Sequence, residues 1–241
     1  MAGTRRPWRL VDDLDRPRGA AGQMEADRAL LEAVVSGGPP VLRLYRWAPP
    51  ALSLGRFQAD QDVDTAACAR FGVEVVRRPT GGRALLHGGD LTYAVAMPQP
   101  PGAAGAVDAV YCLLAAGLVA GLAGLGVRAA VARHEGPAGA VCMATQQGAD
   151  LRVGDRKVCG SAQVRQRGVV LQHGSLLIER LPFDETDLVT GSDPAPGARE
   201  RLRTATVTLA ELGAPTDLAT VGAAVVAGFR SALEVEFAPP E

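Results

Sequence analysis

Apolar and polar side chains follow one another in patterns that separate helical from extended segments of the chain. Between residues 23 and 35 the apolar positions recur at helical spacing, and the Gly-Gly-Pro-Pro segment 37–40 ends this helix. Between residues 41 and 47 apolar and polar side chains alternate, which is typical of a half-buried strand. Further helices are predicted over residues 63–70, 107–125, 206–212 and 217–232. Further strands are predicted over residues 8–12, 51–57, 73–77, 91–97, 128–132, 149–153, 157–165, 168–178 and 233–237.

The order of these segments predicts the fold class. Turns or polar loops are expected at residues 17–22, 98–106, 182–187 and 191–200. The strand 51–57 is expected to pair with the strand 41–47 across the turn at Pro49 and Pro50. Strands and helices do not alternate strictly, and we find no internal repeat and no clear linker. We therefore predict a single α+β domain over residues 1–241, with a mixed, mostly antiparallel sheet.

The nineteen uncharged residues from Ala109 to Val127 are long enough for a membrane span. Nine of them are alanine or glycine, which add little free energy of transfer into a bilayer, although Gly117 and Gly121 form a G-x-x-x-G pattern. We therefore predict a buried helix and no membrane contact. The amino-terminal segment lacks the apolar stretch of a signal peptide, which predicts a cytoplasmic protein with reduced cysteines.

The net charge of −1 argues against general nucleic-acid binding, because that function needs a basic surface. Positive charge is nevertheless concentrated in two segments. Residues 77–87 contain three arginines and no acid, and residues 156–173 contain four basic side chains and no acid. Two basic segments in a neutral chain indicate an anionic ligand or an acidic protein partner.

Lys157 is the only lysine among the 25 basic residues of the chain. Where only a positive charge is needed, arginine serves in this sequence, so a retained lysine indicates a need for a compact amine that can lose its proton. The small residues Gly160 to Ala162 follow it, and small side chains let a ligand approach the backbone closely. Lys157 is a candidate functional residue, with Gly160 and Ala162 as candidate substrate contacts. The alternative is that one lysine was retained by chance.

A second candidate site follows the predicted strand 73–77, where Gly81 and Gly82 form a predicted turn. Adjacent glycines after a strand expose backbone N–H groups, and the arginines beside them, of which Arg77 is the first, can neutralise a phosphate or a carboxylate. A plain hairpin turn with solvated arginines would give the same pattern.

The four cysteines and three histidines do not show the spacing of a metal site, so we expect no bound metal ion. Cys68 and Cys112 fall in predicted helices, where a free cysteine is most often a small buried hydrophobic residue. Cys159 lies two residues after Lys157, so on a regular strand both side chains would point to the same face. Cys159 is therefore a candidate nucleophile, and burial in the core is the alternative.

Three segments carry a resemblance to a known family. They are QMEADRALLE from residue 23, VRRPTGGRALLHGGDLTYAV from residue 76 and GDRKVCGSAQVRQRGVVLQHGSLLI from residue 154. Through them the chain resembles the biotin/lipoate A/B protein ligase superfamily, and within it the cysteine-dependent protein N-octanoyltransferases. The resemblance implies a central sheet flanked by helices, a narrow tunnel for a medium-length acyl chain, and an essential lysine at the position of Lys157.

The resemblance also implies a reaction. Cys142 lies fifteen residues before Lys157, where the octanoyltransferases keep the cysteine that accepts the acyl group. Cys142 is expected to attack octanoyl-acyl-carrier protein and to hold the octanoyl group as a thioester, while Lys157 exchanges a proton with it. The acceptor would be a lysine of a lipoyl domain or of the glycine cleavage H protein, without a cofactor. Gly81, Gly82 and His87 would shape the acyl site.

Three other functions remain open. An ATP-dependent lipoate ligase would use Lys157 to bind an acyl-adenylate, and a non-catalytic module would bind lipoyl domains without turnover. Transfer of octanoyl between two lipoyl-type domains would retain Cys142 and differ in its donor. One departure from the pattern of the octanoyltransferases is Gly88, which lies where relatives often have an aspartate after the motif histidine.

Overall fold

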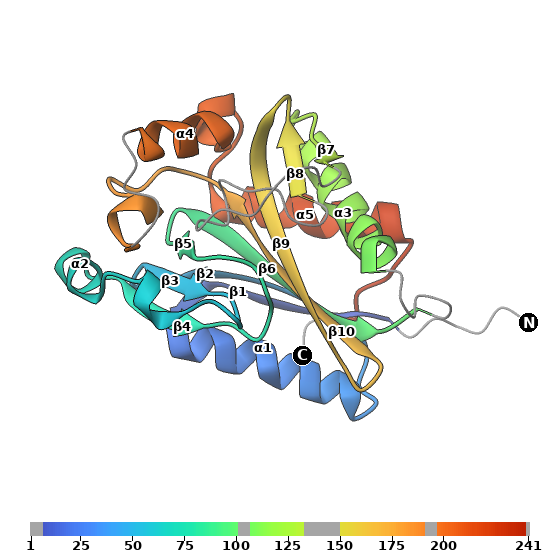
Figure 1. Cartoon of the computed structure of the whole chain (residues 1–241). Helices are drawn as coiled ribbons and strands as arrows, with labels where there is room; N and C mark the ends of the chain where they lie inside the picture. Colours follow the sequence, from blue (N-terminus) through green and yellow to red (C-terminus); the bar gives the residue numbers. More distant parts are fainter. Residues whose placement is uncertain (1–6, 101–106, 133–149, 191–196, 240–241) are drawn as a thin grey trace, which may run out of the picture.

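The computed structural model describes residues 7–100, 107–132, 150–190 and 197–239, and its largest element is a seven-stranded sheet (Figure 1). The strands lie in the order β1-β2-β6-β10-β9-β8-β7. Neighbouring strands run antiparallel except β1 and β2, so the sheet is mixed and mostly antiparallel, as expected. The strand bounds are β1 (Arg9–Arg18), β2 (Val41–Trp47), β6 (Asp90–Pro98), β7 (Ala130–Ala132), β8 (Asp150–Val153), β9 (Arg156–Gln166) and β10 (Val169–Leu177).

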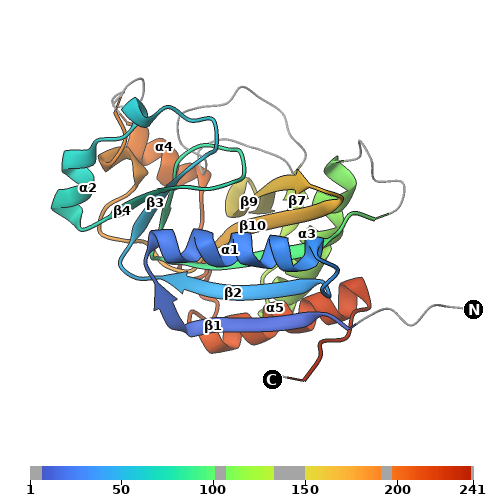
Figure 2. The ribbon, with the colours of Figure 1, turned by 90° about the horizontal axis from the view of Figure 1, so that it is seen from below.

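Helices cover both faces of this sheet (Figure 2). On one face α1 (Ala20–Val35) packs through side chains such as Leu31 against apolar residues of the strands, among them Leu171. On the other face α3 (Val107–Gly124) and α5 (Leu218–Leu233) lie against each other and against the sheet. The sheet therefore buries two apolar layers, and burial of apolar surface at roughly 25 cal/mol per Å² is the main source of its stability.

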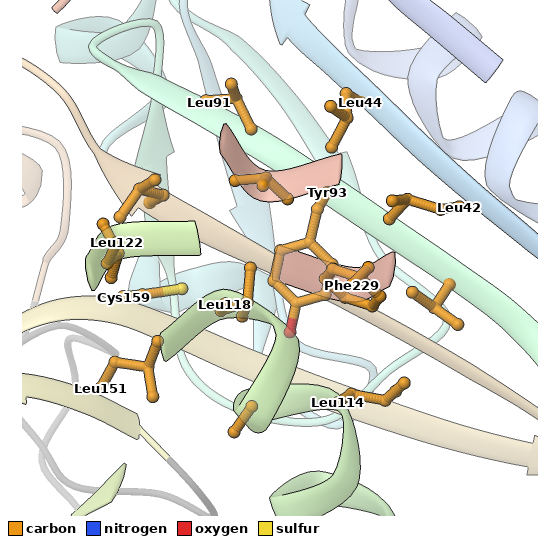
Figure 3. Close-up of a cluster of buried hydrophobic side chains, with 14 of the residues drawn as sticks. Leu42, Leu44, Leu91, Tyr93, Leu114, Leu118, Leu122, Leu151, Cys159 and Phe229 are labelled. Carbon is orange, nitrogen blue, oxygen red and sulfur yellow. The ribbon is translucent and has the colours of Figure 1, made fainter. Parts of the chain in front are cut away.

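The larger apolar layer lies between the sheet and the helices α3 and α5 (Figure 3). Leu114, Leu118 and Leu122 recur every four residues along α3, which places them on one face of the helix. They meet Tyr93 of β6 and Phe229 of α5 in the same buried cluster. The apolar segment of the sequence thus forms a helix with one face buried in the core and the other exposed, so the expectation of a fully buried helix is only partly met.

The contact between α3 and α5 depends on glycines. A Cβ atom at Gly117 would lie 2.8 Å from the ring of Phe229, and one at Gly228 would lie 2.2 Å from the carbonyl oxygen of Gly117. The G-x-x-x-G pattern of the sequence therefore allows two helices inside the protein to approach closely. Across the described ranges, no helix is both long enough and apolar enough to cross a membrane.

A second sheet contains three strands in the order β4-β3-β5. β3 (Ala51–Leu54) pairs in parallel with β4 (Glu74–Arg77) and antiparallel with β5 (Leu85–His87). The expected pairing of residues 51–57 with β2 is therefore wrong. The two prolines before β3 have no N–H groups to donate, so the chain does not continue the ladder as a hairpin would.

Other segments also differ from the prediction. β1 continues to Arg18 and α1 begins at Ala20, so no separate turn forms over residues 17–22. α4 (Ala198–Ala205) begins within the polar loop expected over residues 191–200, because Leu202 packs inward while the arginines of this helix stay exposed. The expected strand 233–237 is reduced to a single bridge between Trp8 and Phe237. The remaining elements are α2 (Thr65–Phe71) and the 3-10 segments η1 (Asp60–Asp62), η2 (Glu185–Asp187) and η3 (Ala210–Leu212).

We expect Gly228→Ala to lower the free energy of unfolding by about 1–3 kcal/mol, because the new methyl group would overlap the backbone of α3. The matched control is Gly124→Ala in α3, where a Cβ atom would meet no heavy atom within 4 Å. Alanine favours a helix over glycine, so the control should leave stability unchanged or raise it. Urea unfolding measures both, and equal stability of the two variants would contradict the close helix contact.

Candidate active site

A mostly apolar pocket lies where α1, the central sheet and the small sheet meet. Met24 of α1, Tyr45 and Trp47 of β2 and Leu85 of β5 supply much of its apolar wall. The other residues that line it are Ser53, Arg78, His87, Thr92, Gly160, Ser161, Ala162, His173 and Gly174. Glycine and alanine on β9 leave space where larger side chains would fill the pocket.

The pocket brings together three residues that the sequence indicated, His87, Gly160 and Ala162. They come from β5 and β9, which belong to different sheets. Lys157, the residue that drew attention to this segment, lies on the same strand as Gly160. Cys142, the predicted nucleophile, lies outside the described residues.

The imidazole of His87 is held between a carboxylate and a hydroxyl group. Its Nδ1 lies 2.9 Å from Oδ2 of Asp90, and its Nε2 lies 2.9 Å from Oγ of Ser53. The ring also stacks on Trp47, with centroids 4.2 Å apart. Gly88 has no carboxylate, and Asp90 provides one for His87 instead. The signal in the sequence that could have identified Asp90 was an acid three residues after the histidine.

Asp90 is buried and carries a negative charge. Burial is the largest single influence on its carboxyl group and would raise the pKa. The charge and hydrogen bond of His87, with the hydrogen bonds from Ser175 and from the backbone N–H of Gly88, lower the pKa and together outweigh burial. The net effect lowers the pKa of Asp90 below its ordinary value. A carboxylate at this position fixes the orientation of the His87 ring.

The second histidine of the pocket, His173 on β10, is held in the same way. Its Nδ1 lies 2.9 Å from Oδ2 of Asp27, and its Nε2 lies 2.7 Å from Oγ1 of Thr80. Asp27, on α1, also accepts hydrogen bonds of 2.9 Å from Arg43 and from the hydroxyl of Tyr45. Both ring nitrogens of both pocket histidines therefore have partners inside the protein.

The two adjacent arginines after β4 have different roles. Arg78 is buried and donates hydrogen bonds to the carbonyl oxygens of Ser53, Gly81 and Arg83 at 2.6–2.9 Å. It supports the Gly81-Gly82 turn from inside, so it is not a surface arginine that an acidic partner domain could reach. Gly82 has a φ of +93°, a conformation that favours glycine, and its carbonyl oxygen lies against Gly55.

Arg77 points to the neighbouring loop. It donates hydrogen bonds of 2.7 Å to the carbonyl oxygens of Gly55 and Gln58, and it forms an ion pair with Asp60. Arg77, Gly81 and Gly82 are absent from the lining of the pocket as far as the described residues define it. These three predicted substrate-binding residues therefore shape the loop and turn beside the pocket.

Lys157 is almost completely buried and pairs with a buried acid. Its Nζ lies 2.9 Å from Oδ2 of Asp150, and each side chain is 1% exposed. Taking two charges out of water is costly, and a pair of this kind persists where the geometry and further hydrogen bonds compensate. Asp150 was not predicted from the sequence as the partner of Lys157. The signal in the sequence was an acid at the start of the strand that pairs with the strand of Lys157.

Cys159 lies in the apolar core, among Leu118, Leu122 and Leu151 (Figure 3). Burial, followed by the nearby charge of Asp150, raises the pKa of its thiol to about 12. The thiol is therefore protonated at neutral pH, and burial accounts for this residue better than a role as nucleophile.

The two remaining described cysteines differ from each other. Cys68 on α2 is buried, as expected, and burial followed by the charge of Asp64 raises its pKa. Cys112 on α3 is exposed, so the expectation that it is buried is wrong. The helix is apolar on most of its surface, and the sequence did not show which side faces the sheet. Within the described ranges, no three His, Cys, Asp or Glu side chains are grouped closely enough to hold a metal ion.

Glu185 binds the backbone of β5, the strand that carries two residues of the pocket wall. Its Oε1 accepts a hydrogen bond of 3.2 Å from the backbone N–H of Leu86, whose neighbours Leu85 and His87 line the pocket. The side chain is buried, and burial raises the pKa of its carboxyl group to about 7. The contact joins residues 99 positions apart, so no local pattern could have shown it.

Comparison with known proteins establishes the family. Residues 20–230 match the model of the lipoyl protein ligase A/B catalytic domain. The chain belongs to this family. It is 41% identical to the octanoyltransferase LipM of Kyrpidia tusciae, over 97% of this chain and 90% of that protein. It is also 41% identical to the octanoyltransferase LipM of Symbiobacterium thermophilum, over 96% of this chain and 88% of that protein. The predicted family and the predicted enzyme class, an acyltransferase, are confirmed.

Solved structures of the family share the fold. A lipoate-protein ligase A bound with ATP matches with a TM-score of 0.75 at 22% identity, covering 97% of this chain and 87% of that chain. A bi-partite lipoate protein ligase from Thermoplasma acidophilum matches with a TM-score of 0.74 at 22% identity, over 97% and 86% of the two chains. The α+β class with helices on both faces of the sheet is thereby confirmed.

Glu185→Gln tests the effect of the buried carboxyl group on stability. Because the folded pKa of about 7 lies above the unfolded value, the contribution of Glu185 is most favourable below about pH 4 and is lost as pH rises to about 7. The wild type should therefore lose about 2 kcal/mol more than Glu185→Gln between pH 5 and pH 8. Urea unfolding at both pH values gives the difference. Glu25→Gln, at an exposed position of α1, should follow the wild type, and the same pH response in all three proteins would contradict the assignment.

A double-mutant cycle tests the buried pair. Asp150→Asn alone or Lys157→Gln alone leaves one buried charge without its partner, and each should lower the free energy of unfolding by about 3–5 kcal/mol. The double variant removes both charges, so it should cost at least about 1 kcal/mol less than the sum of the single changes. Urea unfolding of the four proteins gives the coupling free energy, and additive effects would show that the pair is not coupled.

Proposed function

We propose that this protein transfers an octanoyl group from octanoyl-acyl-carrier protein to a lysine of a lipoyl domain or of the glycine cleavage H protein, for lipoate biosynthesis, through a thioester on Cys142. The observation that carries the proposal is the apolar pocket, whose wall includes the segment Gly160 to Ala162 just after Lys157. An apolar pocket with a few polar groups in its wall suits an acyl chain whose reactive carbonyl group is handled by polar residues. The name of the relatives at 41% identity, octanoyltransferase, agrees with this reading.

The polar groups of the pocket support an acyl chain as its occupant. His87 and His173 each use both ring nitrogens for contacts within the protein. They present no nitrogen that would require a hydrogen bond from the ligand, so an alkyl chain can lie against them without leaving a polar group unsatisfied. The same contacts argue against either histidine as the catalytic base.

The positions of the described cysteines support Cys142 as the nucleophile. Cys159 is enclosed in the core with a strongly raised pKa, and Cys68 is buried under α2. Cys112 is exposed on α3, which covers the face of the sheet opposite to α1 and the pocket. This leaves Cys142, to which we assign the thioester.

The reaction that follows has two balanced steps. The thiolate of Cys142 attacks the octanoyl thioester, the bond to the carrier breaks, and the carrier thiolate leaves and takes up a proton. The acceptor lysine amine then attacks the thioester on Cys142, an amide forms, the amine loses a proton, and the Cys142 thiolate leaves. We assign to Lys157 the exchange of these protons, with Asp150 fixing the position of its amine.

Intact-protein and peptide mass spectrometry with octanoyl-acyl-carrier protein, without ATP, tests the proposal. We expect an octanoyl adduct that hydroxylamine removes, that maps to Cys142, and that is lost in Cys142→Ala. Cys159→Ala and Cys112→Ala are the matched controls, and both should form the adduct as the wild type does. An adduct on Cys159 would refute the assignment of the nucleophile.

Two further arms separate the neighbouring functions. If no adduct forms without ATP, while ATP and free octanoate or lipoate support modification of a lipoyl domain even in Cys142→Ala, the protein is a ligase and the proposal is wrong. If octanoylated lipoyl domain loads Cys142 and octanoyl-acyl-carrier protein does not, the donor is wrong and the thioester chemistry is retained.

A further inference from the structure

The face of the central sheet that α1 covers is built from rows of directly opposed residues. Opposed residues on antiparallel strands point to the same face, and successive rows on that face lie two residues, about 7 Å, apart. Across β2, β6, β10 and β9 the first row is Tyr45, Thr92, Ser175 and Gly160, the second is Arg43, Ala94, His173 and Ala162, and the third is Val41, Ala96, Leu171 and Val164. Position along β9, from Gly160 to Val164, is therefore a measure of depth on this face.

The pocket extends over the first two rows and ends at the second. Three members of the first row and two of the second line it, namely Tyr45, Thr92, Gly160, His173 and Ala162. As far as the described residues define the pocket, no member of the third row is part of its lining. On β9 the lining therefore begins at Gly160, on the side of Lys157, and stops at Ala162, farther along the strand.

A buried ionic network closes the pocket at the second row. Asp27 reaches the sheet from α1 and binds His173 and Arg43, each at 2.9 Å. Arg43 also binds Asp13 at 2.9 Å. Asp27 is 0%, Arg43 1% and His173 6% exposed. Because displacement of any of these groups would leave a buried polar or charged atom unsatisfied, the network resists an alkyl chain that pushes against it.

Beyond the network the same face is apolar again. α1, which lies along this face (Figure 2), repeats the order of the rows at intervals of one turn. Met24 lines the pocket, Asp27 binds His173, and Leu31 belongs to the same apolar cluster as Leu171 of the third row. The end of the pocket is therefore a polar, hydrogen-bonded wall inside the protein, with apolar side chains on both sides of it.

We propose that the wall formed by Asp27, Arg43 and His173 sets the length of the acyl chain, and that Ala162 contacts the last carbon atoms of that chain. This inference rests on the proposed function, in which the carbonyl group reacts on the side of Lys157 and the chain extends along β9 away from it. Ala162 lies opposite His173, and its small side chain leaves the second row open. A chain longer than octanoyl would have to break buried hydrogen bonds to go deeper.

A chain-length series tests the wall. We measure the second-order rate constant with which the butanoyl, hexanoyl, octanoyl, decanoyl and dodecanoyl thioesters of N-acetylcysteamine acylate the enzyme. In the wild type each methylene group up to octanoyl should raise the constant about fourfold, the effect of burying one CH₂ group, and longer chains should gain nothing further. Ala162→Leu fills the second row, so the octanoyl constant should fall at least about fifteenfold, the effect of two methylene groups, while the butanoyl constant is retained.

Val164→Leu is the matched control. Val164 lies on the same strand and the same face as Ala162, but in the third row, among the apolar residues beyond the wall. The larger side chain should therefore leave the chain-length preference as it is in the wild type. The inference is overturned if Ala162→Leu lowers the constants of all chain lengths equally, if octanoyl remains its best substrate, or if Val164→Leu also shifts the preference to shorter chains.

Binding of free fatty acids separates this inference from the proposed function. The rise in melting temperature caused by octanoate reports occupation of the pocket without any reaction at Cys142. If no thioester acylates the wild type, but octanoate stabilises the wild type and Val164→Leu more than Ala162→Leu, the thioester reaction has failed and the wall is retained. Equal stabilisation of the three proteins by octanoate, or none in any of them, would overturn the wall.

Discussion

A charged group buried beside an apolar pocket must find its partner inside the protein, and the structure around this pocket is built on that requirement. Asp27 and Arg43 are buried in the layer between α1 and the sheet, where isolated charges would cost several kcal/mol each. Asp27 binds Arg43, Tyr45 and His173, and Arg43 also binds Asp13 on β1. One carboxylate thus links α1, β2 and β10, and its removal would take one partner from each of Arg43, Tyr45 and His173.

The same requirement explains how a pocket lined in part by polar residues can present a mostly apolar surface to a ligand. Ser53, His87 and Asp90 satisfy one another in one series, and Thr80, His173 and Asp27 do so in another. Each series has the order hydroxyl, imidazole, carboxylate. Groups that are fully hydrogen-bonded form rigid walls, because moving any one of them would expose an unsatisfied buried atom. The surface that remains for a ligand is then set by carbon atoms and by the shape of the wall.

The sequence predicted where helices and strands form better than it predicted which strands pair. Apolar periodicity identified α1 and β2, but β2 is buried on both faces of the sheet and not half-buried as its alternation predicted. The strand β3 was also predicted, but its partner was predicted wrongly, because its four residues are all buried and their pattern does not indicate which strands lie beside it. Lys157 could be singled out because one lysine among arginines is unusual, and His87 because of its motif. Asp27 could not, because it meets His173 across 146 positions of the chain.

The adjacent arginines at the end of β4 show why residue type alone does not assign a role. Arg77 and Arg78 point in different directions, as neighbours on an extended segment do. Arg78 turns inward and holds the Gly81-Gly82 turn against the pocket, while Arg77 holds the loop of Phe57. The guanidinium groups of this segment therefore bind mainly backbone carbonyl oxygens. What the two arginines provide is the position of the pocket wall and of the loop beside it, so one short segment fixes both.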